Sequence, residues 1–151
     1  MAKAVDSGLT VRKSMTVPLA PADAFRLFTE RMATWWPLAT HSVYETEATG
    51  VVVEPRIGGR IYETTDDGRT SEWGVVSAWS PGERFATSWH PGNEPALATQ
   101  IDVTFSPTPD GGTRVDLVHT GWEARGTEAA KLASGYDTGW DFVLGRFVEA
   151  A

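Results

Sequence analysis

Three side chains in this sequence could exchange a proton with a bound molecule, and Glu63 is the first of them. It stands two residues after Ile61 in the run Arg60 to Thr65, and alternate residues of a β-strand share one face. If Ile61 points inward, Glu63 does too, and a carboxylate removed from water could act there as an acid, a base or a hydrogen-bond anchor. Alternatively, a bulge inverts this short strand, and Glu63 pairs with an arginine at the rim.

Two histidines are the other candidates for acid–base chemistry. His119 shares a predicted strand face with Val115 and Leu117, so its imidazole should point to the inner side of the sheet, where a lone histidine is more often structural. His41 follows a tryptophan pair in a loop and is the better functional candidate. The chain has one further histidine, His90. No pair among the three histidines has the sequence spacing of a known metal-binding motif, so we expect no metal site.

The sequence contains none of the motifs that mark a nucleophile elbow, a phosphate loop or a dinucleotide site. Gly58-Gly59 precedes a predicted strand, whereas phosphate binding would use the N-terminus of a following helix. The absence of cysteine excludes disulfides, thiolate zinc sites and a cysteine nucleophile. We therefore expect no cofactor.

The charge and hydropathy of the chain exclude further classes of partner. A formal net charge of −7 and a pI near 4.9 oppose binding to phosphate backbones, and the thirteen Lys and Arg residues are scattered. Residues 1–9 lack the apolar stretch of a signal peptide, and no later run is long enough to span a membrane. These features predict a cytoplasmic protein that neither binds nucleic acid nor inserts into membranes.

Aromatic residues are the most distinctive feature of the composition, since seven Trp, six Phe and three Tyr make up 11% of the chain. Aromatic side chains at strand or helix spacing are usually core residues. Flat indole rings can also line a binding site, where each N–H supplies one polar contact. Both interpretations stay open for Trp35, Trp36, Trp73, Trp89 and Trp140.

The elements that must position these residues follow from hydrophobic periodicity. Apolar and polar residues alternate in stretches separated by Gly, Pro and Asp turns, which predicts an antiparallel sheet. The chain has the length of one domain, and we assign a flexible N-terminus to residues 1–8 and a single domain to residues 9–151. The predicted strands are 9–17, 51–54, 60–65, 72–79, 85–89, 97–105 and 114–119.

Two segments have helical character. Pro21 and Asp23 begin a short helix, and apolar residues every three or four positions predict a long amphipathic helix over residues 127–149. Gly135 and Gly139 each weaken this long helix by about 1 kcal/mol relative to alanine, a cost that a close approach to the sheet would offset. The order of elements predicts an α+β fold in which a curved antiparallel sheet surrounds the C-terminal helix.

Several short motifs over residues 10–148 are individually weak but specific in their order: Trp35-Trp36-Pro37, Glu54 to Arg60, Trp73 to Val76, Thr104 to Pro107, Gly112 to Val115, His119 to Trp122 and Gly139-Trp140. Together they resemble the bacterial relatives of the heat-shock protein 90 ATPase activator, a family of the START-like, polyketide-cyclase-like (SRPBCC) superfamily. The resemblance implies a helix-grip, Bet v-like fold that holds an apolar or amphipathic ligand between the final helix and the concave sheet. The family name does not by itself imply a chaperone role, because a fold does not transfer a function.

The leading hypothesis is therefore a binding domain for a small hydrophobic or amphipathic molecule. One alternative is an enzyme of cyclase or lyase type that uses Glu63 with His41 or His119. Another is a chaperone-related protein-interaction module, and a homodimer is a further option. The residues expected to bind the ligand are Trp35, Trp36, His41, Glu63, Trp73, Trp89, Thr99, His119, Tyr136 and Trp140.

Overall fold

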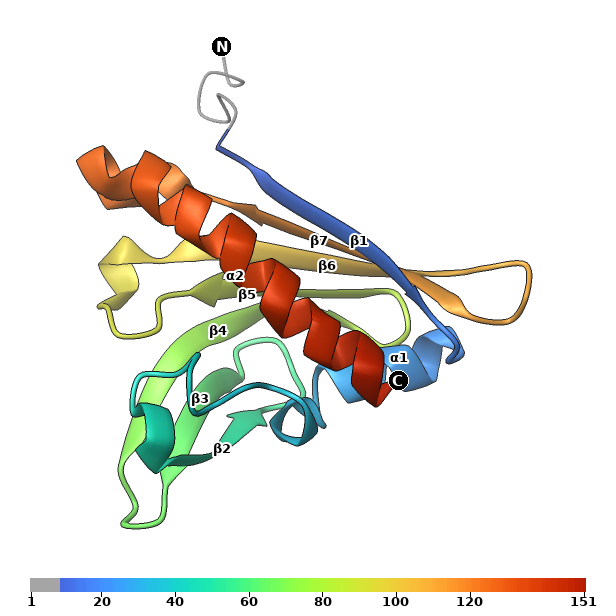
Figure 1. Cartoon of the computed structure of the whole chain (residues 1–151), viewed down its shortest axis with the longest axis horizontal. Helices are drawn as coiled ribbons and strands as arrows, with labels where there is room; N and C mark the ends of the chain where they lie inside the picture. Colours follow the sequence, from blue (N-terminus) through green and yellow to red (C-terminus); the bar gives the residue numbers. More distant parts are fainter. Residues whose placement is uncertain (1–8) are drawn as a thin grey trace.

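In the computed structural model, which describes residues 9–151, a curved antiparallel sheet faces one long C-terminal helix (Figure 1). The sheet has seven strands in the order β1-β7-β6-β5-β4-β3-β2, so β1 pairs with β7 and the other strands follow one another as neighbours. This is the predicted α+β helix-grip architecture. The segment predicted to be flexible, residues 1–8, lies outside the described residues.

The elements match the predicted order, with ends that differ by a few residues. Short 3₁₀ segments, such as residues 32–34, 45–47 and 122–128, connect some of them. The strands and α-helices are β1 (Val11–Val17), α1 (Pro21–Phe28), β2 (Ala48–Val53), β3 (Arg60–Thr65), β4 (Thr70–Ser80), β5 (Arg84–Trp89), β6 (Thr99–Pro107), β7 (Thr113–Thr120) and α2 (Ala129–Ala150).

Alternation of buried and exposed residues fixes which face of the sheet turns toward α2. In β7 the residues Val115, Leu117 and His119 are all buried, while the residues between them are not. In β3 both Ile61 and Glu63 are fully buried, so the strand keeps the face that the sequence pattern predicts. The inner face therefore receives a carboxylate and an imidazole along with apolar side chains.

Strand β4 departs from this alternation at a bulge. Ile61 pairs with Gly74 and Tyr62 with Glu72, which leaves Trp73 as an extra residue between the two pairs. Trp73 and Gly74 are consequently both buried. Gly74 is required there, because a Cβ atom at this position would lie 1.9 Å from the carbonyl oxygen of Ser88.

Helix α2 crosses the inner face of the sheet diagonally (Figure 1). It begins at Ala129, two residues later than predicted, because Gly126 has a positive φ of 58° that interrupts helical geometry. The ammonium group of Lys13 on β1 lies 3.0 Å from a carboxylate oxygen of Asp137 and 2.8 Å from one of Asp141. These ion pairs join the helix to the edge of the sheet beside it.

The expected close approach of α2 to the sheet at its glycines is wrong. A Cβ atom added to Gly135 or Gly139 would meet no other atom within 4 Å. Both glycines instead line a cavity between α2 and the sheet, so they leave space empty where a side chain would have filled it.

One end of the space under α2 is filled by aromatic core. The Phe28 ring lies 5.1 Å from that of Phe147, and the Trp35 ring lies 5.2 Å from the same phenylalanine. The indole N–H of Trp35 donates to the carbonyl of Leu27 at 2.8 Å. Trp35, predicted to bind a ligand, is therefore a packed core residue away from the cavity.

Candidate functional site

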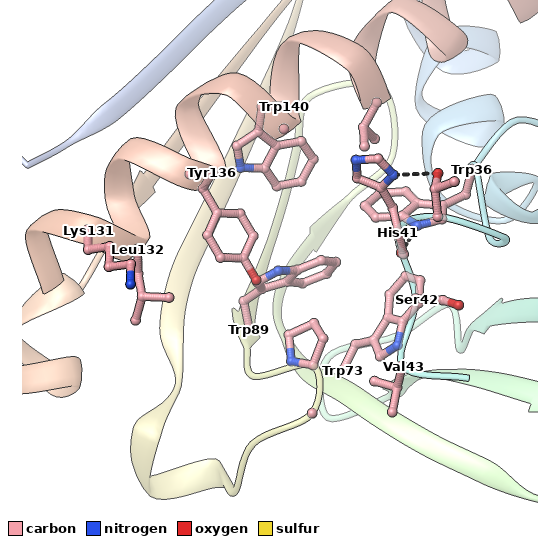
Figure 2. A pocket seen from close by; sticks show the side chains of 16 residues that line it. Trp36, His41, Ser42, Val43, Trp73, Trp89, Lys131, Leu132, Tyr136 and Trp140 are labelled. Atoms are coloured by element: carbon pink, nitrogen blue, oxygen red, sulfur yellow. Dashed lines mark hydrogen bonds between the residues drawn. The ribbon is translucent and has the colours of Figure 1, made fainter. Parts of the chain in front are cut away.

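The cavity lies between α2, the loop after the tryptophan pair, and the ends of β4 and β5 (Figure 2). Its volume of about 750 Å³ is within the range usual for small-molecule sites. Of the residues predicted to bind a ligand, the cavity brings together Trp36, His41, Trp73, Trp89, Tyr136 and Trp140.

Four tryptophans form one continuous aromatic wall. The ring of Trp36 lies 5.1 Å from that of Trp73 and 5.9 Å from those of Trp89 and Trp140. Trp73 and Trp89 are 5.5 Å apart, and Trp89 and Trp140 are 6.0 Å apart. The rings are tilted or edge to face, as aromatic quadrupoles favour, so each ring restrains the next.

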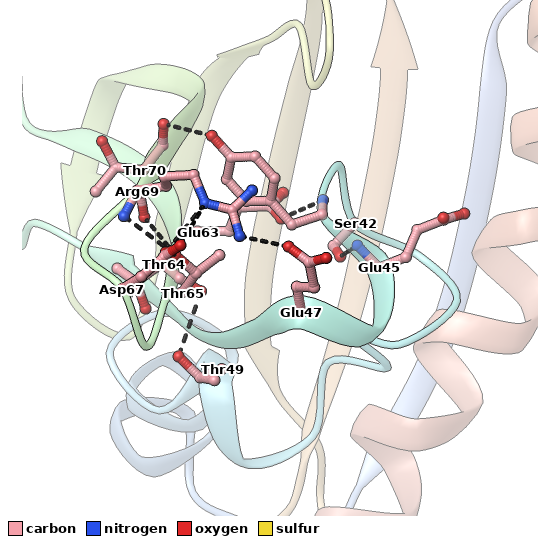
Figure 3. Close-up of polar contacts among 11 residues, drawn as sticks. Ser42, Glu45, Glu47, Thr49, Glu63, Thr64, Thr65, Asp67, Arg69 and Thr70 are labelled. Atoms are coloured by element: carbon pink, nitrogen blue, oxygen red, sulfur yellow. Dashed lines mark hydrogen bonds and ion pairs between the residues drawn. The ribbon is translucent and has the colours of Figure 1, made fainter.

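Glu63 does not line the cavity but holds one of its walls in place (Figure 3). Its carboxylate accepts 2.8 Å hydrogen bonds from the backbone N–H groups of Val43 and Tyr44, and a 2.6 Å bond from the indole N–H of Trp73. The charge is fully buried and engaged by three donors. Glu63 therefore anchors the loop that carries His41, and it does not pair with an arginine at the rim as the alternative prediction had it.

Further contacts hold this loop at the cavity. The carbonyl of His41 accepts a 2.8 Å bond from the Trp36 indole, and the His41 ring stacks 5.1 Å from Phe142 of α2. The hydroxyl of Tyr44 donates to the carbonyl of Thr70 at 3.0 Å, and the guanidinium of Arg69 lies over the Tyr44 ring. The loop is thus attached both to the β3–β4 hairpin and to α2.

His119 is fully buried behind the aromatic wall and does not line the cavity. Its Nδ1 accepts a 3.0 Å bond from the Trp140 indole, and because an indole only donates, the ring proton must be on Nε2. That proton is donated to the Thr99 hydroxyl, 2.6 Å away, which can itself donate to the carbonyl of Trp89 at 3.3 Å. Burial lowers the pKa of His119 to about 3, so the ring is neutral.

Thr99 therefore belongs to this buried chain of hydrogen bonds and not to the cavity surface. The chain runs from Trp140 through His119 and Thr99 to the backbone of Trp89, and so it connects α2, β7, β6 and β5. It orients the indole of Trp140, which lines the cavity, and ties it to the backbone of β5.

The indole nitrogen of Trp89 is the polar atom of this wall that lacks a partner. Trp89 is only 4% exposed, and within the described residues its N–H makes no hydrogen bond. The hydroxyl of Tyr136 lies beside it and covers it from the cavity (Figure 2). Burial raises the pKa of that hydroxyl, and the neighbouring Trp89 indole opposes the rise.

Sequence reasoning missed several residues of the site. Trp122 is not among the predicted site residues, yet it is buried, with its ring 4.3 Å from that of His119. The predicted role of the paired helix glycines, a close approach to the sheet, is wrong, and two costly glycines one turn apart were instead a signal of a space between helix and sheet. The missed lining residues are Thr40, Ser42, Val43, Pro91, Gly92, Lys131, Leu132, Gly135, Gly139 and Val143.

Within residues 9–151, no three His, Asp or Glu side chains are grouped so that they could hold a metal ion. No helix in the same range is both long and apolar enough to cross a bilayer.

A curled antiparallel sheet that grips one long C-terminal helix places the protein in the helix-grip class of START-like (SRPBCC) folds. Residues 18–151 match the model of the family described as Activator of Hsp90 ATPase homolog 1-like protein. The chain belongs to this family. None of the functionally curated proteins matches the sequence.

Solved structures support the same assignment. The chain is 34% identical to the anthrahydroquino-gamma-pyrone synthase Txn09, solved in complex with SUM, over 94% of this chain and 96% of that one, with a TM-score of 0.65. It is 27% identical to CalC, a self-sacrificing resistance protein from Micromonospora echinospora, over 93% and 92%, with a TM-score of 0.65. A Mesorhizobium loti protein, 20% identical over 93% and 94% with the same TM-score, shares the fold.

Proposed function

We propose that this protein binds a small hydrophobic or amphipathic molecule in the cavity between α2 and the sheet. The observation that carries the proposal is the cavity itself, about 750 Å³ in volume and walled by four tryptophans. A hydrophobic chain normally fills such a space with side chains, because interiors are close-packed. Here the helix instead presents two glycines to it.

The cyclase or lyase alternative receives less support from the geometry. Glu63 is engaged by three N–H donors and His119 by two hydrogen bonds, and neither lines the cavity. His41 is the one member of the proposed acid–base set that does, with its Nδ1 2.7 Å from the Thr40 hydroxyl. An acid–base mechanism of this type needs two residues within reach of the same ligand. Of the proposed set, only His41 meets that condition.

The similarity to Txn09 guides the choice of probes. Its name describes the synthesis of an anthrahydroquino-gamma-pyrone, a fused-ring molecule, so aromatic compounds belong in the panel with lipids and bile-acid-like amphiphiles. Chaperone contact, a homodimer and a cytoplasmic location remain predictions from the sequence.

The test is a binding screen with 9-fluorenone, oleate and cholate, read by tryptophan fluorescence and thermal melting. A bound probe at 100 times its Kd should stabilise the protein by about 2.7 kcal/mol. Leu132→Trp should fill part of the cavity and reduce the effect, because Leu132 lines it. Val148→Trp is the matched control on the same helix, because Val148 is 40% exposed and is not a lining residue.

Native mass spectrometry of the protein purified from its own host is the complementary measurement, and a retained small molecule would identify the ligand class. No response to any probe, together with an empty protein in the mass spectrum, would refute the proposal. Equal responses in the Leu132→Trp and wild-type proteins would place binding outside this cavity and would also refute it.

A further inference from the structure

Two glycines lie on the α2 side of the cavity. Gly135 and Gly139 lie one helical turn apart and both line the cavity, and a Cβ atom at either position would meet nothing within 4 Å. Alanine would fit the unliganded protein at both positions and would favour the helix. Stability alone therefore does not explain these glycines, whereas a ligand surface that lies directly against the helix backbone does.

The opposite side supplies rings and one unused donor. Trp36, Trp73 and Trp89 line the cavity on the side away from α2 (Figure 2). The N–H of Trp89, a residue 96% buried, makes no hydrogen bond of good geometry within residues 9–151 and has only the adjacent hydroxyl of Tyr136 as an acceptor, and a buried donor that is poorly paired destabilises a protein. Tyr136, whose hydroxyl lies beside this N–H, is only half-buried on α2, so a ligand that displaced its side chain would reach the N–H.

From these two observations we infer that the cavity takes a flat, fused-ring aromatic ketone. The ring system lies against Gly135 and Gly139 and among the tryptophans, and its carbonyl oxygen accepts a hydrogen bond from the Trp89 indole after Tyr136 turns aside. Aromatic rings fit this space because they offer both faces and edges to the surrounding indoles. The inference rests on the proposed function and specifies its ligand.

A matched pair of probes tests the hydrogen bond. 9-Fluorenone and fluorene are both flat, neutral, three-ring molecules, and they differ by one carbonyl group. The wild-type protein should bind 9-fluorenone about fivefold more tightly than fluorene, as expected for one hydrogen bond to a buried donor. Trp89→Phe keeps a ring but removes the N–H, and the ratio of the two affinities should fall to about 1 while packing losses cancel between the probes.

A second set of variants tests the fit against the helix. Gly139→Ala should raise Tm by about 2 to 4 °C, because alanine favours the helix, and yet weaken 9-fluorenone binding about tenfold, because a methyl group then occupies the ring's place. Gly145→Ala is the matched control, since Gly145 is an exposed α2 residue outside the cavity with nothing within 4 Å of its Cβ position. It should raise Tm equally and leave binding unchanged.

The results separate this inference from the proposed function. Three results would overturn this inference alone. The first is a preference for 9-fluorenone over fluorene that persists in Trp89→Phe. The others are an unchanged affinity of Gly139→Ala for 9-fluorenone, or tighter binding of cholate than of 9-fluorenone. Failure of every probe to bind, with an empty protein in native mass spectrometry, would overturn both. Two results together would establish the inference. Trp89→Phe should bind 9-fluorenone and fluorene with equal affinity, and Gly139→Ala should have a higher Tm but a lower affinity for 9-fluorenone.

Discussion

The stability of this protein should fall as the pH is lowered from 7 to 5, and His119 should be the cause. The folded protein holds this ring neutral with a pKa of about 3, against 6.5 for an ordinary histidine, because the ring is fully buried. Protonation would also place a proton on Nδ1, which accepts the hydrogen bond from Trp140. The unfolded chain therefore binds a proton at a pH where the folded protein does not.

The sign and size of the effect follow from this difference. A histidine with a depressed folded pKa contributes its full stability above pH 6.5 and loses it progressively as the pH falls toward 3. A pKa difference of about 3.5 corresponds to about 5 kcal/mol in total, of which about 2 kcal/mol should be lost by pH 5. Asp67 and Asp110 have lowered pKa values, so their contributions are lost only at more acidic pH, near and below the ordinary value of 3.8.

Urea unfolding followed by tryptophan fluorescence at pH 5, 6, 7 and 8 measures this loss directly. His119→Gln should be less stable at pH 7 but should lose about 2 kcal/mol less than the wild type between pH 7 and 5. NMR of the imidazole protons in the wild-type protein is an independent readout, in which the His119 ring should stay neutral at pH 5. An equal pH dependence in both proteins, or a His119 ring that titrates near pH 6.5, would refute the reasoning.

Three further substitutions test the supports of the cavity. Glu63→Gln should destabilise the protein by about 3 kcal/mol, because three N–H donors lose their carboxylate, and amide hydrogen exchange should quicken in the loop 37–47; unchanged protection there would contradict the anchoring role. Gly74→Ala should lower the free energy of unfolding by more than about 3 kcal/mol, because the new Cβ atom meets the Ser88 carbonyl. A variant with the Tm of the wild type would show that glycine is not needed at this position. Trp140→Ala should lower the free energy of unfolding by about 3 kcal/mol, at the low end for a large ring, because part of the ring faces the cavity. A loss of about 5 kcal/mol in a denaturant melt would show that the ring is fully packed core.

Local patterns in the sequence were sufficient for the fold. The alternation in β7 assigned His119 to the inner face, the alternation in β3 offered that face to Ile61 and Glu63 as one of two interpretations, and the periodicity of three to four residues located α2. These predictions succeed because side-chain direction repeats every two residues in a strand and every 3.6 in a helix, so neighbours along the chain carry the information. The same patterns selected the aromatic residues from which the cavity wall is built.

The roles of those inner-face residues depended on the tertiary structure. Glu63 finds its donors on Val43 and Tyr44, about twenty positions earlier in the chain, and no local pattern signals such a partner. His119 acquires its tautomer from Trp140, 21 residues later. The sequence placed the imidazole on the inner face and left two positions open for the carboxylate, and only the fold decided that both would be buried and hydrogen-bonded as supports behind the cavity.

The empty space itself was also decided by tertiary structure. From the sequence, Gly135 and Gly139 are two costly residues in a helix, and a glycine permits a close contact as readily as it leaves a gap. The outcome depends on how far α2 stands from the sheet, where Trp140 of the helix packs against Trp36 and Trp89. Separation between elements is a property of packed side chains from distant parts of the chain, and it is therefore visible only once they are brought together.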